Sequence, residues 1–123
     1  MARVLGLGGI FFKCEDPAKL GNWYKEYLGM PYSPWGAVLE VNALPKDASQ
    51  VWTPFAADTT KFEPSQQPFM INLVVDDVKG VLARVKEGGG TQVGDVTSDE
   101  YGTFGWFLDP VGNKVELWEP AKE

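Results

Sequence analysis

The sequence predicts a single α+β domain made of two tandem copies of one structural unit. The length of 123 residues suffices for one hydrophobic core but not for two independent ones. The composition, 44% hydrophobic and 23% charged, is typical of a globular protein. The decisive observation is a repeat: FFKCEDPAKLGNWYKEYLGM, from Phe11, matches NLVVDDVKGVLARVKEGGGT, which begins 61 residues later at Asn72. Both segments have the pattern strand, acidic pair, helix, glycine.

In the first copy, Asp16 is a suitable N-cap and Pro17 suits the first helical position. Gly29 can end the helix in a left-handed conformation. The pattern predicts an amphipathic helix of about three turns. Its apolar stripe consists of Leu20, Trp23, Tyr24, Tyr27 and Leu28.

In the second copy, Asp77 is the expected N-cap, and the glycines at 88–90 end the helix. Its apolar stripe consists of Val78, Val81, Leu82 and Val85. The two predicted helices therefore occupy equivalent places in the repeat.

Strand-like stretches follow each predicted helix. In the second copy, segments 101–108 and 114–118 flank DPVGN, whose proline, glycine and asparagine favour a turn, so a hairpin is expected. In the first copy, segments 37–41 and 50–55 flank a looser loop. Residues 54–68 are rich in proline and polar side chains, as a linker would be.

One domain, 1–123, is therefore expected, with module one at about 5–57, a linker at about 58–68 and module two at about 69–121.

Strand residues alternate between two faces, which sorts the repeat into two sets of side chains. One face is wholly apolar and is expected to pack beneath the helices, with Cys14 as a small buried hydrophobe rather than a nucleophile. Its members are Ile10, Phe12, Cys14, Ile71, Leu73, Val75, Val115 and Leu117. The opposite face mixes aromatic and polar side chains, which favours a small-molecule pocket or a buried interface.

Charge and composition exclude several classes of partner. The net charge of −6, without a basic stripe, argues against nucleic acid. A single cysteine cannot form an intrachain disulfide, so a cytoplasmic location is the default expectation. The apolar start MARVLGLGGIFF is expected to be a strand rather than a leader, and no stretch is long enough to predict a membrane span.

The repeat, the segment INLVVDDV and above all YGTFGWFLDPVGNKVELWEP resemble the glyoxalase / bleomycin-resistance / extradiol-dioxygenase superfamily, also called vicinal oxygen chelate. The resemblance spans nearly the whole chain. It implies two tandem βαβββ modules whose curved mixed sheets enclose a cleft, and a homodimer.

Metal-dependent members of this superfamily place their ligands at positions that match Gly9, Gln50, Met70 and Glu116. Only Glu116 is a standard ligand, and the chain has no histidine. One carboxylate with one amide oxygen holds Zn, Ni or Fe poorly against water. We therefore expect no metal or other cofactor, and neither glyoxalase-type isomerisation nor ring-cleaving dioxygenation.

The favoured hypothesis is a protein that binds a small aromatic or cationic molecule in the cleft without a metal ion. One alternative is a metal-independent enzyme with Glu116 as general base. Another is a metal-dependent lyase or dioxygenase with an atypical site. The segment 98–102 is either a plain loop or a turn that brings Tyr101 to the cleft. The expected ligand-binding residues are Phe11, Lys13, Gln50, Trp52, Met70, Asn72, Tyr101 and Trp118, with Glu116 as the candidate catalytic or anionic group.

Overall fold

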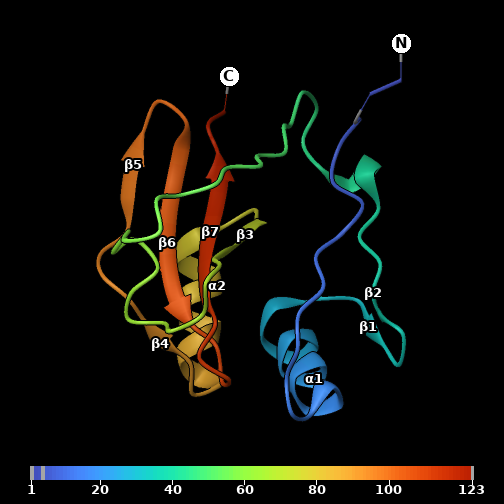
Figure 1. Cartoon of the computed structure of the whole chain (residues 1–123), viewed down its shortest axis with the longest axis vertical. Coiled ribbons are helices and arrows are strands. Elements are labelled where there is room, and N and C mark those ends of the chain that lie inside the picture. The colour runs from blue at the N-terminus through green and yellow to red at the C-terminus, as the bar shows by residue number, and fades with distance from the viewer. Residues whose placement is uncertain (1, 4, 123) are drawn as a thin grey trace.

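The computed structural model describes residues 2, 3 and 5–122 and confirms the α+β class (Figure 1). Its main sheet has five strands in the order β3-β7-β6-β4, with β5 also paired to β6. The β3–β7 pair is parallel and the other pairs are antiparallel. The sheet strands are β3 (Ile71–Val74), β4 (Thr91–Gln92), β5 (Thr97–Asp99), β6 (Gly102–Leu108) and β7 (Lys114–Pro120). The remaining elements are α1 (Pro17–Leu28), α2 (Val78–Glu87), β1 (Tyr32–Ser33), β2 (Gly36–Ala37) and the short 3-10 helix Val41–Ala43.

Both helices begin and end where the sequence predicts. The Asp16 carboxylate accepts a hydrogen bond from the Lys19 backbone N–H at 3.1 Å, and Asp77 accepts one from Gly80 at 3.0 Å. At the end of α1, Gly29 takes a left-handed φ of 68°, a conformation in which a side chain would be strained. Residues next to each helix in the sequence thus mark where the helices begin and where α1 ends.

The predicted hairpin is present as β6 and β7, and Asp109 organises its turn. One carboxylate oxygen of Asp109 accepts the backbone N–H groups of Val111 and Asn113 at 3.1 and 2.9 Å. The other accepts the Asn113 side-chain amide at 3.1 Å. This turn sets the register of the hairpin, in which Phe107 lies opposite Val115.

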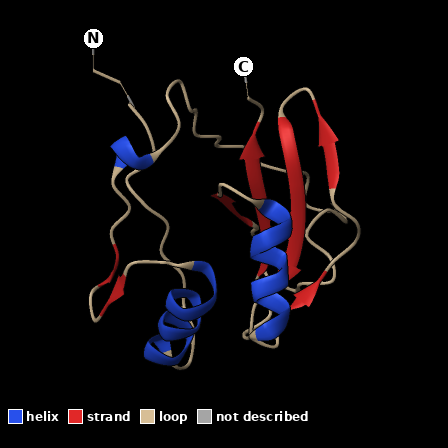
Figure 2. Ribbon diagram, turned by 180° about the vertical axis from the view of Figure 1, so that it is seen from behind, coloured by secondary structure: helices blue, strands red, loops and turns tan. Residues whose placement is uncertain are grey.

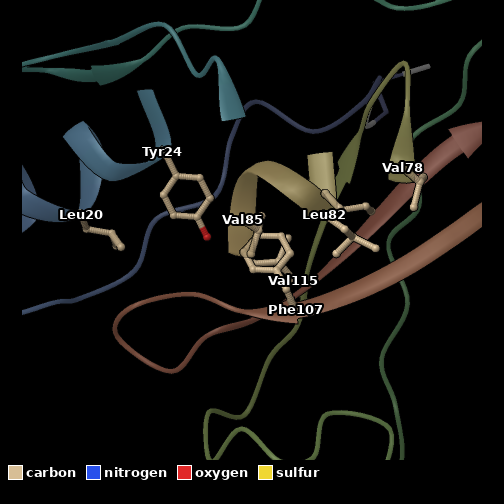
Figure 3. Packing of buried hydrophobic residues seen from close by; sticks show 8 residues of the cluster. Leu20, Tyr24, Val78, Leu82, Val85, Phe107 and Val115 are labelled. Atoms are coloured by element: carbon tan, nitrogen blue, oxygen red, sulfur yellow. The ribbon is translucent and has the colours of Figure 1, made fainter. Parts of the chain in front are cut away.

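The core lies between α2 and one face of the sheet, with α1 beside it (Figures 2 and 3). Gly105 on β6 allows this close packing, because a Cβ there would meet Val78 and Leu82 at 2.8 and 2.9 Å. The buried residues are Leu20, Tyr24, Val78, Leu82, Val85, Phe107, Val115 and Leu117. The expected apolar face of module two is confirmed.

The first half of the chain differs from the expected pattern. Among the described residues, segments 5–14 and 50–55 join no backbone ladder, and segment 37–41 contributes only the end of the two-residue strand β2. The expected burial of Ile10 and Phe12 is wrong, since they are 55% and 41% exposed. Within one chain these extended segments lack a neighbouring strand to cover them. Cys14, as expected, is partly buried and packs against the core.

Helix α1 docks onto module two through polar contacts made by aromatic side chains. The Tyr24 hydroxyl donates to the second oxygen of Asp109 at 2.7 Å, inside the core. The Trp23 indole N–H donates to the Gly88 carbonyl at 2.7 Å, at the end of α2. Burial raises the pKa of Tyr24 well above its ordinary value, and the charge and hydrogen bond of Asp109 raise it further. The hydroxyl of Tyr24 is therefore kept protonated by the folded structure.

Replacing Tyr24 by Phe should lower the free energy of unfolding by about 1–3 kcal/mol, because a buried hydrogen bond to a carboxylate is lost. The native pKa of Tyr24 is raised above its unfolded value of 10.0, so the protein should also lose stability as the pH rises above about 10. Part of that alkaline loss should be absent in Tyr24→Phe. Urea unfolding measured between pH 7 and pH 11 tests both effects.

The matched control is Tyr32→Phe, because the Tyr32 hydroxyl makes only a long, exposed contact of 3.4 Å with the Pro17 carbonyl. Equal effects of the two substitutions would contradict the role assigned to Tyr24.

Candidate functional site

Module two presents a face of its sheet on the side away from α2. Because Phe107, Val115 and Leu117 point into the core, the residues alternating with them point the other way. The register places Trp106 opposite Glu116 and Phe104 opposite Trp118. On the other side of β7, Asn72 lies opposite Glu116. We call this set the open face: Asn72, Phe104, Trp106, Glu116 and Trp118.

Three rings of the open face stand nearly parallel in a row. The ring centroids of Phe104 and Trp118 are 6.2 Å apart with planes 3° from parallel. Those of Phe104 and Trp106 are 6.5 Å apart with planes at 17°. The indole N–H of Trp118 donates to the Tyr101 carbonyl at 2.9 Å, which fixes the orientation of that ring. The aromatic row, Phe104, Trp106 and Trp118, is therefore a partly buried group of three nearly parallel rings.

Glu116 lies beside the aromatic row and is held from both sides. Its Oε1 atom accepts a hydrogen bond from the Asn72 side-chain amide at 2.6 Å. Its Oε2 atom accepts one from the Trp106 indole N–H at 2.9 Å. The two contacts come from the strands on either side of β7, so the carboxylate is fixed by the sheet itself.

Lys114 ties the linker to the sheet beside the open face. Its ammonium donates to the carbonyls of Lys61 and Glu63 at 2.7 and 2.9 Å, and the Ser65 hydroxyl donates to the Gly112 carbonyl at 2.7 Å. Burial lowers the pKa of Lys114, while the charges of Glu116 and Glu63 act in the opposite direction. The linker consequently crosses the sheet on the side away from α2 (Figures 1 and 2).

The predicted site residues fall into two groups. Asn72, Glu116 and Trp118 meet on the open face, and Met70 directly precedes β3. Tyr101 lies in the β5–β6 turn with a 65% exposed side chain and contributes its carbonyl rather than its hydroxyl to Trp118.

The other group lies on the extended segments of module one. Phe11 and Trp52 are 95% and 78% exposed, and Lys13 is exposed as well. The Gln50 side-chain oxygen accepts the Leu7 backbone N–H at 2.8 Å, which links the two segments. A single cleft shared by both groups stays a prediction.

Phe104 and Trp106 were not among the predicted site residues. The signal for them is the same alternation that sorted the other strands, applied to segment 102–108, where Phe104, Trp106 and Leu108 share one face. Their pairing with Trp118 and Glu116 depends on the hairpin register.

The described residues contain no group of three or more His, Cys, Asp or Glu side chains placed to hold a metal ion. None of the described helices is long and apolar enough to cross a membrane. An open hollow of about 520 Å³ lies between α1 and β1, away from the open face, and is lined by Asp16, Asn22, Lys25 and Tyr32 among others.

The comparison with protein families identifies the chain. Residues 9–118 match the model of the glyoxalase-like domain, which covers both repeats and the β6–β7 hairpin. The chain belongs to this family. The family match confirms the resemblance that the DPVGN hairpin and the repeat indicated. The comparison of this chain with curated protein sequences found no match.

Several solved structures are similar to this chain, and the one that follows first shows the same fold. An integron cassette protein from Vibrio cholerae is 14% identical over 91% of this chain and 100% of that one, with a TM-score of 0.51. TnmS3, an antibiotic binding protein from Streptomyces sp. CB03234, is 26% identical over 87% of this chain and 88% of its own, with a TM-score of 0.48. A glyoxalase/bleomycin resistance protein/dioxygenase superfamily member from Sphaerobacter thermophilus is 23% identical over 86% and 90%, with a TM-score of 0.48.

Replacing Lys114 by Met should release the linker, because the two carbonyls that its ammonium binds lose their donor. One of them is the carbonyl of Lys61, which trypsin must attack to cut after that residue. We expect cleavage after Lys61 to become several-fold faster in limited trypsinolysis followed by mass spectrometry, as local opening becomes easier.

Cleavage after Lys46, in an exposed loop, is the internal reference. The control variant is Lys122→Met. Cleavage after Lys61 that is unchanged in Lys114→Met would show that Lys114 does not hold the linker.

Proposed function

We propose that this glyoxalase-like domain binds a small planar molecule, aromatic or cationic, on the open face without a metal ion. The observation that carries the proposal is the aromatic row with a fixed carboxylate beside it. Flat apolar surface with a few oriented polar groups is the usual composition of a small-molecule site.

The aromatic row favours ligands with a ring. Its three rings are held nearly parallel by strand pairing, so their orientation is set before a ligand arrives. A planar molecule that stacks on them removes apolar surface from water and gains aromatic contact without ordering mobile side chains. Leaving such a surface in water is unfavourable, and this favours a binding role over a purely solvated face.

The side chains at the four positions that match metal ligands, together with their neighbours, do not fit a divalent cation. The oxygens of Glu116 face N–H groups of Asn72 and Trp106, and neither an amide nitrogen nor an indole nitrogen is a metal ligand in proteins. Gly9 has no side chain, and the thioether of Met70 suits soft ions rather than Zn, Ni or Fe. The Gln50 oxygen is engaged with Leu7. These contacts support binding without a metal.

Catalysis with Glu116 as general base stays an alternative hypothesis. Its two contacts are with neutral donors that cannot pass on a proton, and both orient the carboxylate as an acceptor. The geometry therefore supports a positioned anion better than a proton carrier.

Replacing Trp118 by Leu should weaken the binding of 2-naphthamide about five- to thirty-fold, because one ring of the aromatic row is lost. The matched control is Trp35→Leu, since Trp35 is 95% exposed in the β1–β2 turn. Titration calorimetry measures both. Equal affinities in the two variants would contradict binding on the open face.

The same titration repeated after EDTA treatment and dialysis should give an unchanged affinity. Binding that disappears with EDTA and returns with Zn, Ni, Mn or Fe would contradict the metal-free proposal.

We further propose that the protein is a homodimer. Segments 5–14 and 50–55 leave their backbone groups without strand partners and expose Phe11 and Trp52. Extended segments with these properties pair readily with a second chain, which covers the apolar side chains as well. A second copy would complete the sheet that module one lacks.

Light scattering coupled to size exclusion should give a dimer mass for the unmodified protein. The double substitution Phe11→Glu and Trp52→Glu should shift it toward monomer, because two charges would enter an apolar contact. Val111→Glu, at an exposed position of the β6–β7 turn, is the control and should remain dimeric. A dimer that persists in the double variant would place the interface elsewhere.

A further inference from the structure

The contacts that hold Glu116 orient its charge without neutralising it. Both hydrogen bonds come from neutral groups, the Asn72 amide and the Trp106 indole. Lys114 is two residues away on the same strand and its charge interacts with that of Glu116, but its ammonium donates its hydrogen bonds to the linker carbonyls of Lys61 and Glu63. A partly buried carboxylate arranged in this way attracts a cation from solution.

The Glu116 carboxylate also has acceptor capacity beyond its two hydrogen bonds. Each oxygen has two lone pairs and accepts one hydrogen bond from the protein. One position on each oxygen is therefore free to accept a donor from a ligand. The two oxygens of one carboxylate can together accept the forked N–H groups of an amidinium, guanidinium or aminopyridinium group.

The rings around Glu116 favour the same class of ligand. Trp106 lies directly opposite Glu116, and Trp118 is two residues further along β7 on the same face. Indole faces attract cations and stack on flat rings, most strongly when the cation is partly removed from water. A flat cation can satisfy the carboxylate and the aromatic row at the same time, which a neutral ring cannot.

We propose that the ligand class of the open face is a planar organic cation that stacks on the aromatic row and donates N–H groups to Glu116. This inference rests on the proposed function, since it specifies the ligand of the same site. The role of Trp106 is then twofold: its ring contacts the ligand, and its N–H positions the carboxylate.

Three probes of similar size separate charge from shape. The first is 2-naphthamidine, a cation with a fork of N–H donors. The second is 2-naphthamide, its neutral counterpart, and the third is 1-methylquinolinium, a flat cation without an N–H group. Titration calorimetry with the full chain should give at least about tenfold tighter binding of the amidine than of the amide, with methylquinolinium in between.

The variant Glu116→Gln keeps the shape of the side chain and removes its charge. The amidine should lose at least about tenfold in affinity, while the amide changes less than about threefold. The matched control is Glu87→Gln, an equal change of net charge at an exposed position on α2, on the opposite side of the sheet. It should retain the full preference for the amidine.

A second variant guards against misfolding of the first. Trp106→Phe keeps an aromatic ring but removes the N–H that holds Oε2. Its preference for the amidine over the amide should fall several-fold, with methylquinolinium binding less affected. Circular dichroism establishes that each variant is folded.

The outcomes distinguish the two proposals. If the amide binds as tightly as the amidine, and Glu116→Gln changes neither, the cation inference is wrong while aromatic binding stands. If none of the three probes binds the unmodified protein, both proposals fail. Loss of amidine binding in Glu87→Gln as well would show that general electrostatic attraction, rather than Glu116, selects the cation.

Discussion

The carboxylate of Asp109 makes hydrogen bonds that join the two halves of this protein. It accepts two backbone N–H groups and one side-chain amide within its own turn, and the hydroxyl of Tyr24 from the first half of the chain. A charged group that is 5% exposed is stable there only because four donors surround it. The same group thus shapes the hairpin and anchors α1 to module two.

The hairpin, once its turn is set, determines both faces of the sheet. A register shift of one residue would exchange the core residues Phe107 and Leu117 with Trp106 and Trp118. Because the core face packs against α2, with Gly105 leaving room for the helix, only one register buries the right residues. The open face is therefore a consequence of core packing, and its aromatic row and carboxylate are positioned by the hairpin that also forms the core.

The two predicted modules differ in how far the sequence repeat extends to the structure. Module two forms its sheet within one chain, because β7 has a partner on each side. Module one has the same helix signals and forms the equivalent helix, yet its extended segments remain unpaired in a single chain. Helix signals are local, whereas strands require pairing partners from a distant part of the same chain or from a second chain.

The sequence by itself determined the elements whose physics is local: two capped helices, the DPVGN hairpin and the alternation that separates Leu117 from Glu116 and Trp118. It also singled out Asn72, Glu116 and Trp118, which the structure brings together. Only the tertiary structure decided that Phe104 and Trp106 join them, because cross-strand neighbours depend on register. It also decided that Glu116 is held by neutral donors while Lys114 turns to the linker, since these contacts join residues far apart in the chain.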